Sequence, residues 1–279
     1  MPGTGTVVIT GASTGIGRAS ALRLDGRGFD VVAGVRRPED AESLQAEASG
    51  RLRTVTLDIT DGAAIDALAD TLGDQALAGL VNNAGIAVGG PLEFVSVEDF
   101  RRQLEVNLVG MFAVTKALLP RLRAGGGRIV NIGSVGGRSA SPFLGPYSAS
   151  KYGVEALTDT LRQELRPWGM QVAVVEPGAI ATPMWDKGRQ TADDLSEQLP
   201  PEGMKLYGRV LPAMQRVAAQ MERRAIPADK VAQAVEHALT ARRPRTRYVV
   251  GAEARAQIAL KALLPARAMD GVVARVMGL

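Results

Sequence analysis

The chain contains no cysteine and one histidine, His237, among its 279 residues. Cysteine nucleophiles, disulfide frameworks and multi-histidine metal sites are therefore excluded, and we expect no bound metal. His237 lies in the helical periodicity from Asp229 to Thr240, so we interpret it as a satisfied or solvated helix residue. The chemistry must come from other oxygen and nitrogen groups.

Long hydrophobic runs are also missing, and no stretch of about 18 apolar residues occurs. The first strand pattern begins within a few residues of the start, which leaves no space for a secretory signal, so we expect a cytoplasmic protein. The 33 basic and 29 acidic residues are interspersed, so the net charge of +4 predicts a mixed, solvated surface and no nucleic-acid partner.

Short β-branched runs alternate with longer helical periodicities. We predict strands at residues 6–10, 29–34, 52–57, 77–81, 128–132, 171–175 and 247–250, and helices at 16–26, 39–48, 61–72, 97–123, 146–167 and 227–240. Strands that are apolar on both faces indicate a parallel sheet covered on each side by helices. The sequence therefore predicts an α/β, doubly wound, Rossmann-type sheet of seven strands in one dinucleotide-binding domain spanning residues 1–279.

The first strand meets its helix at a glycine-rich segment, residues 10–17. Glycines let the backbone approach a pyrophosphate, and the helix N-terminus adds N–H groups and a favourable dipole. A Walker loop is disfavoured because Arg18 and Ala19 follow Gly17 where that motif needs Lys and Ser or Thr. The residues predicted to bind the phosphates are Gly11, Ser13, Thr14, Gly15, Ile16 and Gly17.

The end of the second strand predicts the form of the dinucleotide. An acidic residue there would bind the ribose 2′-hydroxyl of NAD, whereas a guanidinium would bind the 2′-phosphate of NADP. Arg36 and Arg37 occupy this position, and we assign Arg36 to the phosphate. NADP(H) is favoured over NAD(H), although two surface arginines opening a loop would give the same pattern.

Three further strand ends carry residues suited to a cofactor. Asp58 could accept a hydrogen bond from the adenine amino group, and small residues after the fourth strand would let the backbone approach the cofactor. Each could instead be ordinary turn chemistry, but their joint placement favours a single site. The residues assigned to it are Asp58, Ile59, Asn83, Ala84, Gly85, Pro177, Gly178, Ile180 and Thr182.

Tyr147 and Lys151 stand four residues apart, thirteen residues after Ser134. A phenol and an amine at this spacing share one helix face, so the ammonium can lower the pKa of the phenol and make it a proton donor near neutral pH. An exposed pair with no function is the alternative for these two residues taken alone.

With these motifs in order from Thr10 to Thr182, the chain resembles the short-chain dehydrogenase/reductase family, and in part its retinol- and hydroxysteroid-type members. The resemblance implies an NAD(P)-dependent enzyme that interconverts a carbonyl and an alcohol. It implies that Tyr147 transfers the proton, Ser134 hydrogen-bonds the substrate oxygen, Lys151 lowers the tyrosine pKa and binds the nicotinamide ribose, and Asn107 holds a water. A non-catalytic redox sensor or scaffold with the same fold remains the alternative.

We expect the substrate specificity to be set by an insertion at residues 183–224, which is long enough to form a lid. Apolar residues interleaved with charges suit an apolar carbonyl or alcohol of the steroid, retinoid, fatty or xenobiotic kind, although plain core packing fits them equally. The residues assigned to the substrate are Ser134, Phe94, Phe143, Met184 and Trp185.

Beyond Gly251 the tail, residues 252–279, is amphipathic and basic. It could close the active site, pack on another subunit or lie on a membrane surface, and we favour packing because Pro265 interrupts the apolar stripe. The two long helices, 97–123 and 146–167, match those through which relatives associate, so a homodimer or homotetramer is expected.

Overall fold

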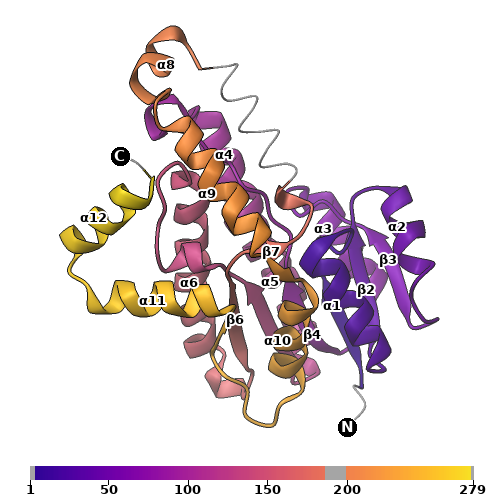
Figure 1. Ribbon diagram of the computed structural model, residues 1–279. Coiled ribbons are helices and arrows are strands. Elements are labelled where there is room, and N and C mark those ends of the chain that lie inside the picture. The colour runs from indigo at the N-terminus through magenta and orange to yellow at the C-terminus, as the bar shows by residue number, and fades with distance from the viewer. Residues whose placement is uncertain (1–3, 186–198, 278–279) are drawn as a thin grey trace.

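A seven-stranded parallel sheet forms the centre of the molecule, with the strand order β3-β2-β1-β4-β5-β6-β9 (Figure 1). The computed structural model describes residues 4–185 and 199–277. The strands are β1 (Thr6–Ile9), β2 (Asp30–Val35), β3 (Leu52–Thr56), β4 (Leu77–Asn82), β5 (Arg128–Ile132), β6 (Val172–Pro177) and β9 (Arg247–Val250). The predicted doubly wound fold with seven strands is confirmed, and the strand order reverses beside β1.

Helices cover both faces of the sheet and bury two large apolar cores and a smaller cluster of Met111, Val154 and Val174. On one face lie α1 (Gly15–Gly26), α2 (Pro38–Gln45) and α10 (Asp229–Thr240), which contribute Leu24, Leu44 and Val235 to the first core. On the other lie α3 (Gly62–Leu72), α5 (Met111–Ala124) and α6 (Gly145–Glu164), and Leu68 and Leu118 belong to the second core. Element ends differ from the predicted ones by up to three residues.

The predicted helix 97–123 is not uniform. It consists of α4 (Val97–Leu104), a π-helical segment (Glu105–Gly110) and α5. At the end of that segment the backbone packs so closely that a Cβ on Gly110 would lie 2.6 Å from the carbonyl oxygen of Ile59. A π-helical turn changes the hydrogen-bond spacing without changing the apolar pattern, so the sequence periodicity could not reveal it.

The insertion after β6 begins with β7 (Ile180–Ala181), which pairs in parallel with β8 (Ile226–Pro227). Between them lie α8 (Pro201–Tyr207) and α9 (Leu211–Arg223), which rise above the sheet (Figure 1). The part of the predicted lid at residues 186–198 lies outside the described residues. Short 3₁₀ turns occur at Leu92–Phe94, Val135–Gly137 and Arg166–Trp168.

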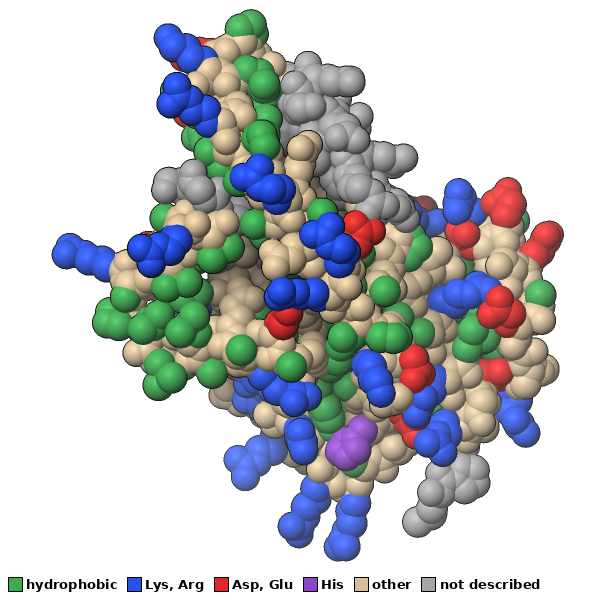
Figure 2. Space-filling view, viewed as in Figure 1, with side chains coloured by type: hydrophobic (Ala, Val, Ile, Leu, Met, Phe, Trp, Pro, Cys, Tyr) green, Lys and Arg blue, Asp and Glu red, His purple; other side chains and the backbone are tan. Residues whose placement is uncertain are grey.

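The tail forms two helices, α11 (Ala252–Leu263) and α12 (Ala266–Met277), and Leu264 and Pro265 separate them. α11 packs against β9 and the turn at Val135–Gly137, and α12 packs against α9, so in the described residues the tail contacts the body of its own chain. In Figure 2 hydrophobic side chains gather over this part of the molecule, with lysines and arginines around them. Across the described ranges no helix is long and apolar enough to cross a membrane.

Buried amides connect the middle of the sheet to the helices above it. Asn82 Nδ2 donates to Asn131 Oδ1 (2.8 Å) and to Thr115 Oγ1 (2.9 Å), and Asn131 Nδ2 donates to Thr158 Oγ1 (2.9 Å). Asn131 and Thr158 are fully buried. Because an unpaired polar group at this depth is costly, the chain of hydrogen bonds fixes how α5 and α6 sit on β4 and β5.

We predict that Asn131→Ala lowers the free energy of unfolding by about 2–4 kcal/mol, because it removes two buried hydrogen bonds, one to Asn82 and one to Thr158, at a fully buried position. Urea denaturation followed by circular dichroism measures this. Gln45→Ala, which removes an exposed hydrogen bond to Thr54, is the control and should cost under about 0.5 kcal/mol. Equal effects of the two substitutions would contradict the role assigned to the buried amides.

Candidate active site

The glycine-rich turn between β1 and α1 is shaped by close backbone approach. Gly11 and Gly15 have φ angles of +64° and +56°, which side-chain-bearing residues rarely adopt. A Cβ on Gly17 would lie 2.2 Å from the carbonyl oxygen of Gly11, so that position tolerates only glycine. Thr14 caps α1 without a side-chain hydrogen bond, which leaves the first amides of the helix available to an anion.

The glycine-rich turn is fastened to the segment after β4. Asn83 Nδ2 donates to the carbonyls of Thr10 (3.0 Å) and Gly11 (2.9 Å), while the amides of Asn83 and Ala84 donate to Thr10 Oγ1. Ala84 also packs on Gly11, where an added Cβ would approach it to 2.8 Å. The structure thus brings Asn83 and Ala84 to the predicted site. Both hydrogen bonds donated by the Asn83 side chain hold the glycine-rich turn in place.

Arg36 follows β2 and is exposed, as a residue that binds a phosphate would be. Asp58 follows β3, and its Oδ1 accepts from the amide (2.9 Å) and hydroxyl (2.7 Å) of Thr60. These hydrogen bonds, chiefly the backbone one, lower the pKa of Asp58, and the nearby Arg36 charge acts in the same direction. The carboxylate is therefore ionised and can accept a hydrogen bond. Ile59 is buried beside it.

The segment after β6 lies against the glycine-rich turn. A Cβ on Gly15 would meet Thr182 Cγ2 at 2.9 Å, so these two predicted cofactor residues are in contact. The amide of Gly178, which follows Pro177, donates to the carbonyl of Val250 (3.0 Å), and Ile180 is buried in β7. The carboxyl ends of β1, β4 and β6 thus converge at one place, as predicted.

Ser134, Tyr147 and Lys151 meet at the carboxyl end of β5. Ser134 is buried, and its Oγ accepts from the amide of Gly136 (3.0 Å), which orients the hydroxyl. The Tyr147 phenol is hydrogen-bonded with the Ser134 side chain. Lys151 Nζ lies 5.8 Å from the centre of the Tyr147 ring and donates to the carbonyl of Ile132 (2.8 Å).

Burial sets the charge states of this group. It raises the pKa of Tyr147, and the hydrogen bond with Ser134 opposes that rise only partly. It lowers the pKa of Lys151 to about 8, against the attraction of the Glu155 carboxylate. The expected net lowering of the Tyr147 pKa is wrong, because burial of the phenol outweighs the groups that would lower it, and the Lys151 ammonium donates to the Ile132 carbonyl.

Asn107 lies in the π-helical segment and is buried. Its Oδ1 accepts from the amide of Ile86 (2.8 Å), and its Nδ2 donates to the Ile86 carbonyl (3.0 Å) and to Ser150 Oγ (3.1 Å). Ser150 Oγ in turn donates to the carbonyl of Tyr147 (2.7 Å). Both donors of the amide are used, so a water on this side chain could bond only to Oδ1.

Gln103 and Ser150 were not predicted from the sequence. Gln103 is fully buried and accepts from the amide of Val88 (2.6 Å) while donating to the carbonyl of Ile86 (3.0 Å). It lies one helical turn before Asn107, so the two amides hold the loop after β4 together. Their spacing on one helix face was the signal that could have identified Gln103.

Aromatic side chains from three segments form a wall near the lid. The ring centres of Phe94 and Phe143 lie 6.0 and 6.1 Å from that of Tyr207 in α8, both edge to face. Phe143 has a φ of 64°, an unusual conformation for this residue, and its carbonyl accepts from the amide of Gly90 (2.7 Å). Of the other predicted substrate residues, Trp185 donates from Nε1 to the carbonyl of Ile180 (2.7 Å), and Met184 is exposed.

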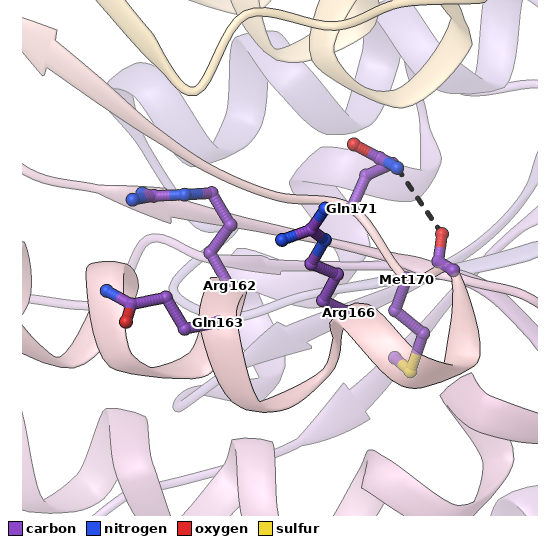
Figure 3. Close-up of a pocket in the computed structure, with 6 residues that line it drawn as sticks. Arg162, Gln163, Arg166, Met170 and Gln171 are labelled. Atoms are coloured by element: carbon purple, nitrogen blue, oxygen red, sulfur yellow. Dashed lines mark hydrogen bonds between the residues drawn. The ribbon is translucent and has the colours of Figure 1, made fainter.

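A pocket of about 370 Å³ elsewhere on the molecule does not belong to this group. It is lined by Arg162, Gln163, Arg166, Gly169, Met170 and Gln171, at the end of α6 and the start of β6 (Figure 3). Arg162 is eleven residues beyond Lys151 on the same helix, roughly 16 Å along the axis. The pocket therefore lies at the amino ends of the strands, opposite the glycine-rich turn.

Comparison with known proteins agrees with this arrangement. The family model described as short chain dehydrogenase matches residues 5–193, which include the glycine-rich turn and Ser134, Tyr147 and Lys151. The chain belongs to the short-chain dehydrogenase family. His237, outside the matched segment, is hydrogen-bonded through Nδ1 to the hydroxyl of Tyr248 (2.8 Å), as a satisfied helix histidine should be.

Relatives in this family are named for alcohol and carbonyl chemistry. The chain is 43% identical over 277 residues to retinol dehydrogenase 5 of Mus musculus, covering 96% of this chain and 87% of that protein. It is 39% identical over 279 residues to 17-beta-hydroxysteroid dehydrogenase type 6 of Bos taurus, with the same coverage. The protein is therefore an NAD(P)-dependent oxidoreductase that interconverts carbonyls and alcohols.

A solved structure supports the fold. A short chain dehydrogenase from Burkholderia cenocepacia J2315, in complex with NADP, shares 26% sequence identity and a TM-score of 0.75, covering 97% of each chain. The similarity therefore covers nearly the whole chain.

We predict that Gly15→Ala weakens binding of the reduced nicotinamide dinucleotide roughly tenfold or more, because it strains a positive φ and drives a methyl group into Thr182. Gly26→Ala in the same helix is the matched control, since no atom lies within 4 Å of the added Cβ. Fluorescence titration with NADPH measures both. Equal affinity of the two variants would contradict the account of the turn.

Proposed function

We propose that this protein reduces an apolar aldehyde or ketone with NADPH, and that Tyr147 donates the proton. The observation that carries the proposal is the phenol of Tyr147, hydrogen-bonded with Ser134 and backed by Lys151, at the strand ends where the glycine-rich turn lies. A phenol and a serine hydroxyl directed at one point can hold a carbonyl oxygen between them. The cofactor supplies the hydride.

The charge state of Tyr147 favours the reductive direction at neutral pH. Because burial raises its pKa above the ordinary value, the group is a phenol, and a phenol can give a proton to the oxygen of a carbonyl. Oxidation of an alcohol needs the tyrosinate, so its rate should increase with pH. Lys151 remains charged below its pKa of about 8, and its charge stabilises the negative charge that develops on Tyr147 as the proton leaves.

The residues around the glycine-rich turn fit a dinucleotide. Three glycines leave room for a pyrophosphate, and the uncapped first amides of α1 would hydrogen-bond to it. Asp58, ionised and partly exposed, would accept from the adenine amino group, and Lys151 would bind the nicotinamide ribose. We assign Arg36 to the 2′-phosphate because it is exposed at the end of β2, while the neighbouring Arg37 is bound to Asp40.

We further propose that residues 183–224 form a substrate lid on a single dinucleotide-binding domain. Phe94, Phe143 and Tyr207 form an aromatic cluster that includes the lid helix α8, which favours a retinoid or steroid over a small polar carbonyl. The names of the relatives agree with this choice.

The proposed assembly is a homo-oligomer through α5 and α6. Val109 in the π-helical segment and Phe112 in α5 are nearly half exposed, so they are apolar side chains that a second subunit could cover.

Tyr147→Phe is predicted to lower kcat for the reduction of retinal or a 3-ketosteroid by roughly 10²–10⁴-fold or more, with NADPH affinity unchanged, because only the proton donor is lost. Spectrophotometric NADPH consumption and fluorescence titration test this. Turnover retained at the wild-type rate with either substrate would refute the role of Tyr147.

Arg36→Ala is predicted to raise the KM for NADPH about 10–100-fold while leaving the KM for NADH nearly unchanged, because the lost contact is to the 2′-phosphate alone. Arg37→Ala is the neighbouring control, since that side chain pairs with Asp40. A wild type that prefers NADH, or an unchanged preference in the Arg36 variant, would show that the assignment is wrong.

A further inference from the structure

A second charged cluster lies directly behind Lys151 and takes no part in the proposed proton transfer. Glu155 stands one turn after Lys151 on α6, so the two side chains share a helix face. Glu176 stands on β6, against which α6 packs, just before Pro177 and Gly178. Both carboxyls are buried, Glu176 completely.

Two guanidinium groups reach this carboxyl pair. Arg247 on β9 places Nε 3.2 Å from Glu155 Oε2 and 3.3 Å from Glu176 Oε1, and Arg138, after the turn at Val135–Gly137, places Nη1 3.3 Å from the same Glu176 oxygen. Arg247 also binds Asp159 at 2.6 Å. The charged groups facing Glu155 are thus Lys151 from α6, Glu176 from β6, Arg247 from β9 and Arg138 from the loop before α6.

The two carboxyls are only partly neutralised by the arginines. Glu155 Oε1 and Glu176 Oε2 are buried with no hydrogen-bond partner among the described residues, although each carboxyl binds an arginine through its other oxygen. Glu155 Oε1 instead lies close to the first residue after β5, since a Cβ on Gly133, next to Ser134, would lie 3.1 Å from it. Two buried carboxyls this close to one another resist holding two negative charges.

Burial and the Glu176 carboxylate raise the pKa of Glu155 to about 7, while Arg247 and Arg138 oppose the rise. Glu155 is therefore ionised above neutral pH, in the range where Lys151, with a pKa of about 8, begins to lose its proton. The Glu155 carboxylate is therefore charged in the pH range in which it can keep Lys151 protonated.

We propose that Glu155 is a positioning residue for Lys151: its carboxylate, held by Arg247 and backed by Glu176, keeps the lysine charged beneath Tyr147. The catalytic part of this inference rests on the proposed role of Lys151. The effect of the Glu155 charge on the Lys151 pKa can be measured without turnover. A purely structural Glu155 would tie the edge strand β9 to α6 through Arg247 and leave Lys151 unaffected.

The chain has six lysines, so the pKa of Lys151 can be measured by NMR titration of protein labelled with ¹³C-lysine, the Lys151 signal being the one absent from Lys151→Met. Glu155→Gln keeps the size and the acceptor for Arg247 but removes the charge, and should lower the Lys151 pKa by roughly one unit. Glu176→Gln removes the repulsion that raises the Glu155 pKa, so Glu155 stays ionised and the Lys151 pKa should not fall. Asp159 lies two turns beyond Lys151 and also pairs with Arg247. Asp159→Asn should therefore leave the Lys151 pKa unchanged.

An unshifted Lys151 pKa in Glu155→Gln, or equal shifts in Glu155→Gln and Asp159→Asn, would overturn the proposal. If Glu155→Gln does not fold, the Glu176→Gln titration decides, and a Lys151 pKa lowered there by about a full unit would show that Glu176, not Glu155, keeps the lysine charged. The pH profile of kcat/KM for reduction separates the two proposals. The pH at which kcat/KM declines on the alkaline side should fall together with the Lys151 pKa. If the Lys151 pKa falls and the pH profile does not change, the catalytic role of Lys151 is contradicted, while the coupling to Glu155 stands.

Discussion

The hydrogen bond from Lys151 Nζ to the carbonyl of Ile132 is the contact on which the site depends. It fixes α6 against the carboxyl end of β5, so the same helix face that carries Lys151 brings Tyr147 to Ser134. It also places a buried ammonium where water cannot solvate it, which makes its charge sensitive to every neighbouring carboxylate. The geometry of the catalytic group and its electrostatics therefore follow from one contact.

The carboxyl ends of the other parallel strands form the dinucleotide site. The glycine-rich turn after β1, Asn83 after β4 and Thr182 after β6 touch one another through contacts that only small residues allow. Asn107 and Gln103 secure the loop after β4 from the opposite side, through the backbone of Ile86. A dinucleotide site and a proton donor are thereby joined in one rigid edge of the sheet, while the apolar wall is supplied by more distant segments.

Much of this arrangement could be predicted from the sequence. Strand and helix periodicities, the three glycines and the spacing of Tyr147 and Lys151 are local signals, so they predicted the sheet and the strand ends where the site lies. Non-local features were not accessible. The π-helical segment around Asn107, the positive φ of Phe143 and the pairing of Glu155 with Glu176 depend on tertiary contacts. The direction of the Tyr147 pKa shift was wrong for the same reason, since i,i+4 spacing shows the proximity of Lys151 but not the burial of the phenol.

The central claim is that the protein transfers hydride to a carbonyl carbon while Tyr147 protonates its oxygen. Reduction of retinal or a 3-ketosteroid with NADPH deuterated at nicotinamide C4, followed by mass spectrometry of the alcohol, tests it most directly. The account predicts that deuterium is transferred from one face of the nicotinamide to the carbinol carbon and is not lost to water. An alcohol whose carbinol carbon carries only solvent hydrogen would contradict it.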